Sequence, residues 1–167
     1  VSQGVSGMKL SRGDRVIGMI VSDNFDNNVL TISKFGMAKR TRLGSGQMIN
    51  QYEENGQKIV DESGEDVFER DGYRKTNRGT KGVRTMALNE GDEIISVRQI
   101  PNLSDQLFML TKSGMMIRLA ANQTKETRGK VAKGTRIMEL RNKDKTGYND
   151  EIIFVARLPS ELVEENN

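Results

Sequence analysis

The sequence contains no cysteine and no histidine. Without them the chain has no disulfide, no zinc site of the usual Cys/His kind and no nucleophile activated by histidine. Tryptophan is absent too, and aromatic residues make up 5% and hydrophobic residues 35% of the chain, which predicts a thin core. No apolar run approaches the ~18 residues that a membrane span requires. These absences argue against a catalytic site, a metal site or a membrane segment, and they fit a cytoplasmic protein.

Charged residues are plentiful but unevenly placed. The net charge of +3 results from 26 basic and 23 acidic residues. The basic residues gather in three groups, namely Lys34, Lys39, Arg40 and Arg42; then Arg74, Lys75, Arg78, Lys81 and Arg84; then Lys112, Arg118, Lys125, Arg128, Lys130, Lys133 and Arg136. The acidic residues collect between positions 53 and 71 and again between 161 and 165. Such segregation favours a surface that binds a polyanion.

An internal repeat is the strongest pattern in the sequence. Three segments align with one another, which are 4–10 (GVSGMKL), 82–88 (GVRTMAL) and 134–140 (GTRIMEL). Each is followed by a turn containing aspartate and then by an apolar run. Further along, 30–36 (LTISKFG) align with 108–114 (FMLTKSG), at the same offset of 78 residues that separates the first two repeats. A repeat of this length is typical of propellers and related arrays.

The repeats have the pattern of short β-strands. The apolar runs 93–97 and 106–110 are bounded by turn residues, and residues 83–88 alternate as a strand does. The segments 34–36 and 112–114 each end in glycine and are typical of tight hairpins. No stretch has a helical period. We therefore predict an all-β fold of propeller or pinwheel blades with about four strands each.

The predicted organisation is one domain and a tail. Residues 1–160 hold about three repeats, which begin near positions 4, 82 and 134. The extra length in the first repeat lies at 44–71, which is acidic and poor in apolar residues, so we expect a mobile insertion there. Residues 161–167 form an acidic C-terminal tail.

Several segments resemble the C-terminal domain family of the DNA gyrase A protein. They are 76–83 (TNRGTKGV), similar to the family's glycine-rich basic box; 36–41 (GMAKRT), similar to its glycine-x-x-lysine-arginine-threonine strand; and 13–18 (GDRVIG) and 91–93 (GDE), similar to its turn before the second strand. The resemblance implies a six-bladed β-pinwheel, of which this chain is roughly half and holds later blades. The box departs from the family pattern at Thr76, where the family has glutamine, and at Thr80, where it has paired glycines.

The resemblance also implies a function. The chain is expected to bind and bend double-stranded DNA around a basic rim, without reading its sequence, as part of an ATP-dependent type II topoisomerase that supercoils DNA in the bacterial nucleoid. The expected DNA-binding residues are Lys39, Arg40, Arg42, Arg74, Lys75, Arg78, Lys81, Arg84, Arg118, Lys125, Arg128, Lys130, Lys133 and Arg136. Expected partners are DNA, the remainder of the gyrase A protein and the gyrase B protein. ATP, magnesium and the catalytic residues are expected outside this chain, and open blade edges predict self-association.

Two other interpretations stay open from the sequence. The chain could be the equivalent domain of topoisomerase IV, which a chiral wrapping assay would distinguish. In a different class, it could be a protein-interaction propeller whose basic rim recruits an acidic partner, which the salt dependence of DNA binding would distinguish. A catalytic tyrosine is not expected, because Tyr52, Tyr73 and Tyr148 lie neither in a helical context nor beside a metal-binding set of carboxylates.

Overall fold

Nine strands and two short helical turns make up the computed structural model, which describes residues 1–128 and 132–164. The strands are β1 (Asn28–Ser33), β2 (Met37–Arg42), β3 (Met48–Asn50), β4 (Phe68–Arg70), β5 (Ile94–Ile100), β6 (Gln106–Thr111), β7 (Met116–Ala120), β8 (Thr135–Arg136) and β9 (Ile152–Leu158). The turns are η1 (Ala121–Gln123) and α1 (Glu161–Glu164). Neither turn, nor any other helix in the described residues, has the length and apolar character of a membrane span. The prediction of an all-β fold is confirmed.

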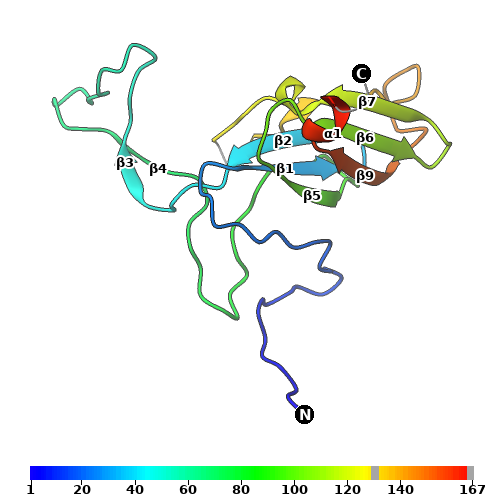
Figure 1. Cartoon of the computed structure of the whole chain (residues 1–167), viewed down its shortest axis with the longest axis horizontal. Helices are drawn as coiled ribbons and strands as arrows, with labels where there is room; N and C mark the ends of the chain where they lie inside the picture. The colour runs from blue at the N-terminus through cyan, green and yellow to red at the C-terminus, as the bar shows by residue number, and fades with distance from the viewer. Residues whose placement is uncertain (129–131, 165–167) are drawn as a thin grey trace.

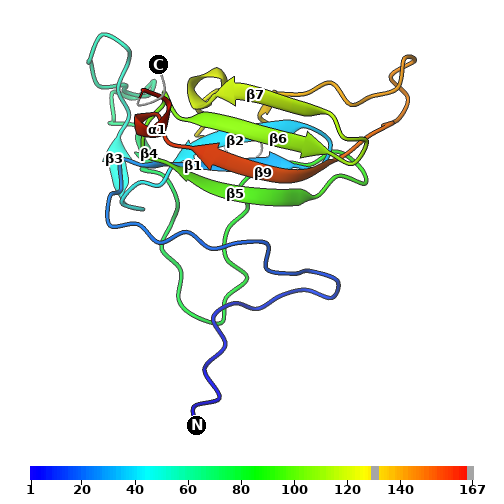
Figure 2. The same cartoon turned by 45° about the vertical axis from the view of Figure 1, so that its right-hand side comes forward.

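Two antiparallel sheets carry the core. The four-stranded sheet has the order β5-β1-β2-β8, and the three-stranded sheet has the order β7-β6-β9. The two sheets meet where β5 lies against β9 (Figures 1 and 2). The buried apolar residues come from both, with Leu30, Ile32 and Ile100 from the first and Leu107, Met109, Ile152 and Val155 from the second. The core is therefore one continuous cluster between two blade-like sheets, and it is as thin as the composition predicts.

Each sheet is assembled from several repeats. In the four-stranded sheet, β1 and β2 form the hairpin of the first repeat, β5 comes from the second repeat and β8 from the third. In the three-stranded sheet, β6 and β7 form the hairpin of the second repeat and β9 comes from the third. Each of these two sheets is thus completed by strands that follow much later in the chain, and neither is formed by one repeat alone.

Residues 83–88 form no strand, so the prediction made from their alternation is wrong for this structure. Their counterpart in the third repeat, β8, is a strand because it pairs with β2, where Met37 lies opposite Arg136 and Ala38 opposite Thr135. No strand of the described residues pairs with 83–88 in a ladder, although Thr85 contacts Thr31 and Lys39 of the first hairpin. Without a paired strand these residues do not form a β-strand, and periodicity in the sequence cannot provide that partner.

The two main hairpins turn in the same way. Gly36 and Gly114 have φ angles of +82° and +89°, a conformation in which a side chain would be strained. An aspartate from the following repeat caps each turn. Asp92 Oδ1 accepts a hydrogen bond from the Phe35 amide at 3.0 Å, and Asp150 Oδ1 accepts one from the Ser113 amide at 3.1 Å. These caps tie each hairpin to the strand that the next repeat adds beside it.

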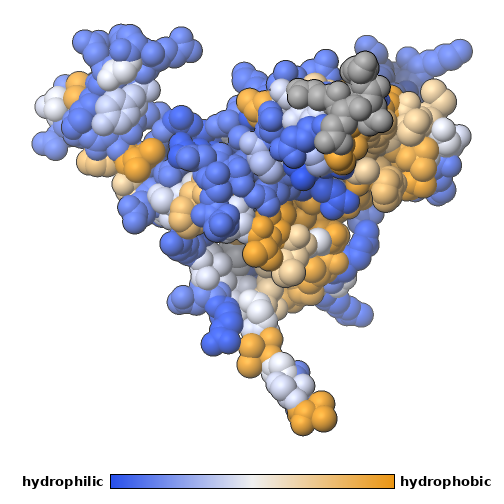
Figure 3. Space-filling view, in the orientation of Figure 1, coloured by the Kyte–Doolittle hydropathy of each residue, from blue (hydrophilic) through white to orange (hydrophobic). Residues whose placement is uncertain are grey.

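The insertion projects from the first repeat. β3 and β4 pair antiparallel with Met48 opposite Arg70, and two isolated antiparallel bridges, Tyr52 to Lys58 and Val60 to Asp66, lie in the segment between them. Figure 1 shows this extension leading away from the two sheets, and Figure 3 shows that its surface is mainly hydrophilic. The segment therefore has regular hydrogen bonding, while its mobility stays a prediction.

The Asp150 cap predicts a pH effect on stability. Its hydrogen bond from the Ser113 hydroxyl, together with other bonds to the carboxylate, lowers the pKa of Asp150 from 3.8 to about 2. A pKa that is depressed in the folded state stabilises the protein above the unfolded pKa, and this contribution is lost as the pH falls from about 4 towards 2. We expect Asp150→Asn to flatten the loss of stability in this window. Urea unfolding of both proteins at several acidic pH values measures it, and identical pH slopes would contradict the assignment.

A glycine next to β8 gives a second prediction about stability. Gly134 precedes β8 with a φ of +81°, and a Cβ built there would overlap the Ala38 carbonyl oxygen. We expect Gly134→Ala to lower the free energy of unfolding by about 1–3 kcal/mol, because the backbone must leave this conformation or the strand must move. Gly7→Ala is the matched control, since its Cβ would meet nothing within 4 Å. Equal stability of the two variants would contradict the prediction.

Candidate nucleic-acid interface

An extended loop, residues 72–90, presents the second basic group to solvent. We call it the basic loop; it leaves the sheets, turns near Gly79 and returns to them (Figures 1 and 2). The side chains of its five cations are exposed and, in the part of the chain that the structure describes, none of them forms an ion pair; they are Arg74, Lys75, Arg78, Lys81 and Arg84. Lys75 instead lies 5.4 Å from the centre of the Phe25 ring. The loop is therefore a concentration of positive charge that no acidic side chain of the described residues pairs with.

Contacts with the sheet hold the returning half of the loop. The Thr85 hydroxyl lies 3.3 Å from that of Thr31 and 2.5 Å from that of Tyr73, and the Thr85 carbonyl accepts a hydrogen bond from Lys39 Nζ at 2.5 Å. Met86, beside it, is buried with 4% of its surface exposed. Because Thr85 and Met86 are anchored against the sheet, the neighbouring Arg84 side chain stays at the surface.

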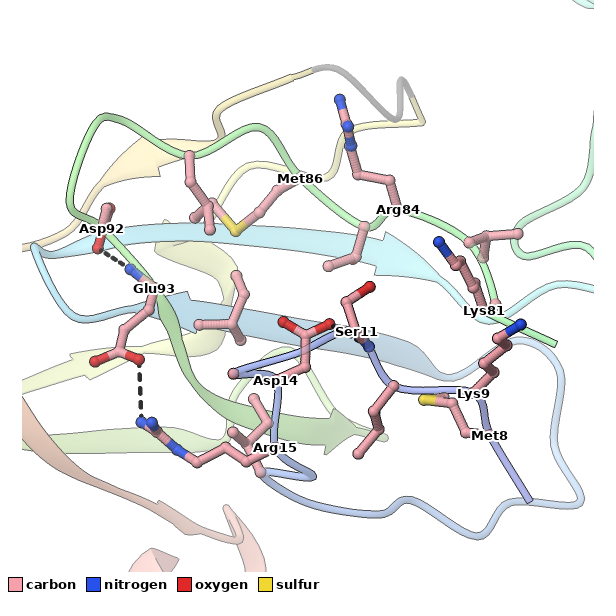
Figure 4. A pocket seen from close by; sticks show the side chains of 18 residues that line it. Met8, Lys9, Ser11, Asp14, Arg15, Lys81, Arg84, Met86, Asp92 and Glu93 are labelled. Carbon is pink, nitrogen blue, oxygen red and sulfur yellow. Dashed lines mark hydrogen bonds and ion pairs between the residues drawn. The ribbon is translucent and has the colours of Figure 1, made fainter. Parts of the chain in front are cut away.

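The N-terminal segment adds a cation to the basic loop. The Lys9 amide donates a hydrogen bond to the Thr80 carbonyl at 3.0 Å, and the Gly79 amide donates one to the Gly7 carbonyl at 3.0 Å. Figure 4 shows Lys9, Lys81 and Arg84 around one end of a groove between the two segments. Sequence reasoning missed Lys9, because its place beside residue 80 depends on a contact between segments more than 70 positions apart.

The opposite end of this groove is acidic. Asp92 and Glu93 line it, and Glu93 forms an ion pair with Arg15 at 3.1 Å. Figure 4 shows Asp92 and Glu93 away from Lys9 and Lys81. Lys9, Lys81 and Arg84 thus place positive charge at one end of the groove, whereas Arg15 at the other end is paired with Glu93.

Two of the predicted DNA-binding residues are buried. Lys39 has 1% of its surface exposed, and burial lowers its pKa from the ordinary value. Arg40 has 7% exposed; its Nε donates to the Thr124 carbonyl at 3.1 Å and its Nη1 lies 3.3 Å from Glu126 Oε2. Both side chains connect a strand to a segment of a later repeat, so they hold blades together in this structure.

Arg42 and Arg128 meet the insertion. Both are exposed and line a small cleft, where Arg42 lies 3.6 Å from Asp71 Oδ1 and also pairs with Asp26, while Arg128 pairs with Glu69. The hydrogen bond from the Ser45 amide, with the nearby arginines contributing less, lowers the pKa of Asp71. The structure brings these two arginines together, but each already has an acidic partner.

The remaining predicted residues are dispersed. Lys133 joins the basic loop through a hydrogen bond from its Nζ to Asn89 Oδ1 at 3.0 Å, and Lys125 is exposed. Arg118 lies on β7 over the Phe108 ring, and Arg136 pairs with Glu139 at 3.4 Å. The position predicted at Lys130 lies outside the described residues. The DNA contacts themselves stay a prediction for all of these residues.

No group of three or more His, Cys, Asp or Glu side chains that could hold a metal ion occurs within the described ranges. The basic loop therefore stands as a surface of cations, glycines and hydroxyls. Such a surface can bind phosphates by charge.

Comparison with known proteins identifies the family. The model of the DNA gyrase C-terminal domain, a β-propeller, matches residues 1–23, 27–45, 67–101 and 105–146. The chain is 29% identical over 168 residues to the DNA gyrase A protein of Campylobacter jejuni, covering 99% of this chain and 15% of the relative. It is 26% identical over 166 residues to the DNA gyrase A protein of Helicobacter pylori strain J99, covering 99% of this chain and 16% of the relative. The chain thus spans about one sixth of these proteins.

One solved structure shows the same fold. The C-terminal domain of Escherichia coli ParC superposes with a TM-score of 0.52 at 18% sequence identity, over 92% of this chain and 49% of that chain. This likeness concerns the fold, and it agrees with the prediction of pinwheel blades that make up about half of a ring. Because the family match covers most of the sequence, including all four strands of the β5-β1-β2-β8 sheet, the chain belongs to the DNA gyrase C-terminal domain family of β-propellers.

Proposed function

We propose that this chain binds double-stranded DNA through the basic loop, without reading its sequence, and bends it. The observation that carries the proposal is the set of five exposed cations in residues 74–84, none of which has an acidic partner in the described chain. By contrast, most other clustered cations are buried or paired, as Arg40, Arg42 and Arg128 are. Unpaired cations on an extended loop are available to replace the counterions of a phosphate backbone.

Membership of the family supports the wider role. In this proposal the chain acts as the DNA-wrapping part of a type II topoisomerase, together with the remainder of the gyrase A protein and with the gyrase B protein. The catalytic residues and the sites for ATP and magnesium lie in those other parts. Bending a short duplex costs on the order of a few kcal/mol, so contacts along the loop and the adjoining Lys9 and Lys133 must exceed that cost.

The basic loop supports positioning of DNA and not base recognition. Its cations are long and exposed, and no rigid helix or strand in residues 74–84 is available to enter a groove. Phosphate contacts fix the duplex without sequence information. The proposal therefore expects similar affinity for unrelated sequences, and a topology assay on relaxed circular plasmid reports whether bound DNA is wrapped with a preferred hand.

Salt dependence tests the phosphate contacts. We expect the logarithm of the association constant to fall with the logarithm of salt concentration at a slope on the order of −4, because about 0.9 counterion is released for each of four or five neutralised phosphates. Fluorescence anisotropy with a labelled duplex at several salt concentrations measures this slope. A slope near zero would contradict the proposal and favour a protein-interaction propeller.

Substitution tests the loop itself. We expect the triple variant Arg78→Ala, Lys81→Ala, Arg84→Ala to reduce the salt slope by about 3 and to weaken binding equally for all sequences, since each cation contributes about one phosphate contact. Lys143→Ala is the control, because Lys143 is also exposed but lies on a different loop. Loss of affinity for only some sequences, or an equal effect of the control, would contradict the assignment.

A further inference from the structure

The insertion that follows β2 contains an eight-residue repeat of its own. Three segments align, which are 52–58 (YEENGQK), 60–66 (VDESGED) and 68–74 (FERDGYR). Each begins with an apolar or aromatic residue, has an acidic residue second and has glycine fifth. The family match passes over residues 46–66, so most of this repeat is specific to the chain and its role does not follow from membership of the family.

Backbone hydrogen bonds join the eight-residue repeats into a three-way junction. The Gln51 amide donates to the Val67 carbonyl at 2.8 Å, and the Val67 amide donates to the Ile59 carbonyl at 3.0 Å. The Ile59 amide donates to the Gln51 carbonyl at 2.9 Å and closes the ring. Three antiparallel pairs lead away from it, namely Asn50 with Phe68, Tyr52 with Lys58, and Val60 with Asp66. We call residues 50–68 the hairpin junction.

The polar members of the three pairs meet on one face of the hairpin junction. Asp66 Oδ2 accepts hydrogen bonds from Asn50 Nδ2 at 3.0 Å and from Lys58 Nζ at 2.8 Å. The bond from Lys58 lowers the pKa of Asp66, and the same bond raises the pKa of Lys58. These three side chains satisfy one another and fix the relative orientation of the three pairs.

Three apolar side chains surround this polar centre. The two members of an antiparallel pair project to the same side of the ladder, so Tyr52, Val60 and Phe68 lie on the face where their polar partners meet. They have 53%, 52% and 55% of their surfaces exposed. We call them the apolar platform. Figure 1 shows the insertion leading away from the two sheets, so the platform lies apart from the core of the chain.

Carboxylates dominate the surroundings of the apolar platform. Residues 50–70 contain seven acidic and two basic side chains. Asp66 pairs with Lys58, and Glu69 pairs with Arg128 from a distant segment. The other acids are exposed and form no ion pair with a described residue; they are Glu53, Glu54, Asp61, Glu62 and Glu65. Glu53 and Asp61 hold the position that Glu69 holds in the third of these repeats, where the acid binds an arginine.

The apolar platform and its charge together select one class of partner. Phosphates of DNA and anionic lipid headgroups are repelled by the surrounding carboxylates. Aromatic side chains are enriched in the contacts between proteins, and complementary charge steers a partner of opposite sign. A polypeptide segment in which basic and apolar residues alternate satisfies both conditions.

We propose that the apolar platform docks a basic segment of a partner protein, whose apolar side chains pack on Tyr52, Val60 and Phe68 while its cations pair with the surrounding carboxylates. The docking site is separate from the basic loop, whose cations lie at 74–84. The docking therefore does not depend on the proposed binding of DNA.

A short labelled peptide of alternating arginine and leucine is the probe for the apolar platform. We expect the full chain to bind it in fluorescence anisotropy, and the double variant Tyr52→Ser, Phe68→Ser to lose about tenfold or more in affinity, since aromatic anchors carry much of the energy of such contacts. Phe154→Ser is the matched control, because Phe154 on β9 is 56% exposed. Circular dichroism verifies that each variant is folded. Absence of binding by the wild type, or an equal loss in the control, would overturn the proposal.

A second substitution tests the carboxylates. We expect Asp61→Asn to weaken peptide binding about two- to fivefold, because one exposed ion pair is lost. Asp144→Asn is the matched control, since each aspartate is exposed and accepts a backbone amide on Oδ1, from Ser63 and from Thr146, a bond that asparagine retains. Equal effects of the two substitutions, or equally tight binding of a peptide with glutamate in place of arginine, would overturn the proposal.

A labelled DNA duplex separates this docking from the proposed function. The variant Tyr52→Ser, Phe68→Ser should bind the duplex as the wild type does, and a loss of duplex affinity would overturn the docking proposal. A wild type that binds the peptide but no duplex would contradict the proposed function alone. In NMR spectra the peptide should shift the amide signals of residues 50–70 and leave those of β6 in place, and the reverse pattern would overturn the docking.

Discussion

The pairing of each hairpin with strands from later repeats is the interaction that holds the structure together. β2 has its outer edge covered only because β8, almost 100 residues later in the sequence, adds to it, and the Arg40 guanidinium then finds acceptors in Thr124 and Glu126. Buried cations are costly unless they are hydrogen-bonded, so Arg40 is compatible with the fold only when these later segments are in place. At β7, which is the last strand of its sheet in the described residues, the equivalent Arg118 is exposed.

The pairing between repeats also divides the basic residues into two classes, those buried on the hairpin strands and those exposed on the basic loop. Lys39 and Arg40, which lie on the hairpin strand β2, are buried and donate hydrogen bonds to segments of later repeats. Cations on the connecting loop remain outside, where no strand covers them and no acid of the described chain neutralises them. The proposed DNA-binding surface is therefore a consequence of the strand exchange, since the loop that enters the next blade must pass over the outside of the sheets.

Several acidic residues pair with arginines that lie outside the basic loop. Glu69 and Asp71, at the base of the insertion, pair with Arg128 and Arg42, and Glu93 pairs with Arg15 at the far end of the groove. Each of these pairs is at least partly exposed and contributes little to stability. Their effect is on the charge pattern, because they neutralise arginines next to the basic loop while its own five cations have no ion pair in the described residues.

The repeat, the all-β class, the glycine turns at 36 and 114 and the basic character of residues 74–84 could all be predicted from the sequence, because each depends on local backbone preference or on composition. Three other features required the folded chain: Lys39 and Arg40 are buried, Lys9 adjoins the basic loop, and residues 83–88 form no strand. Burial and ladder hydrogen bonds require a partner from a distant part of the chain. Alternation shows that a segment can be a strand, and only the presence of a neighbouring edge makes it one.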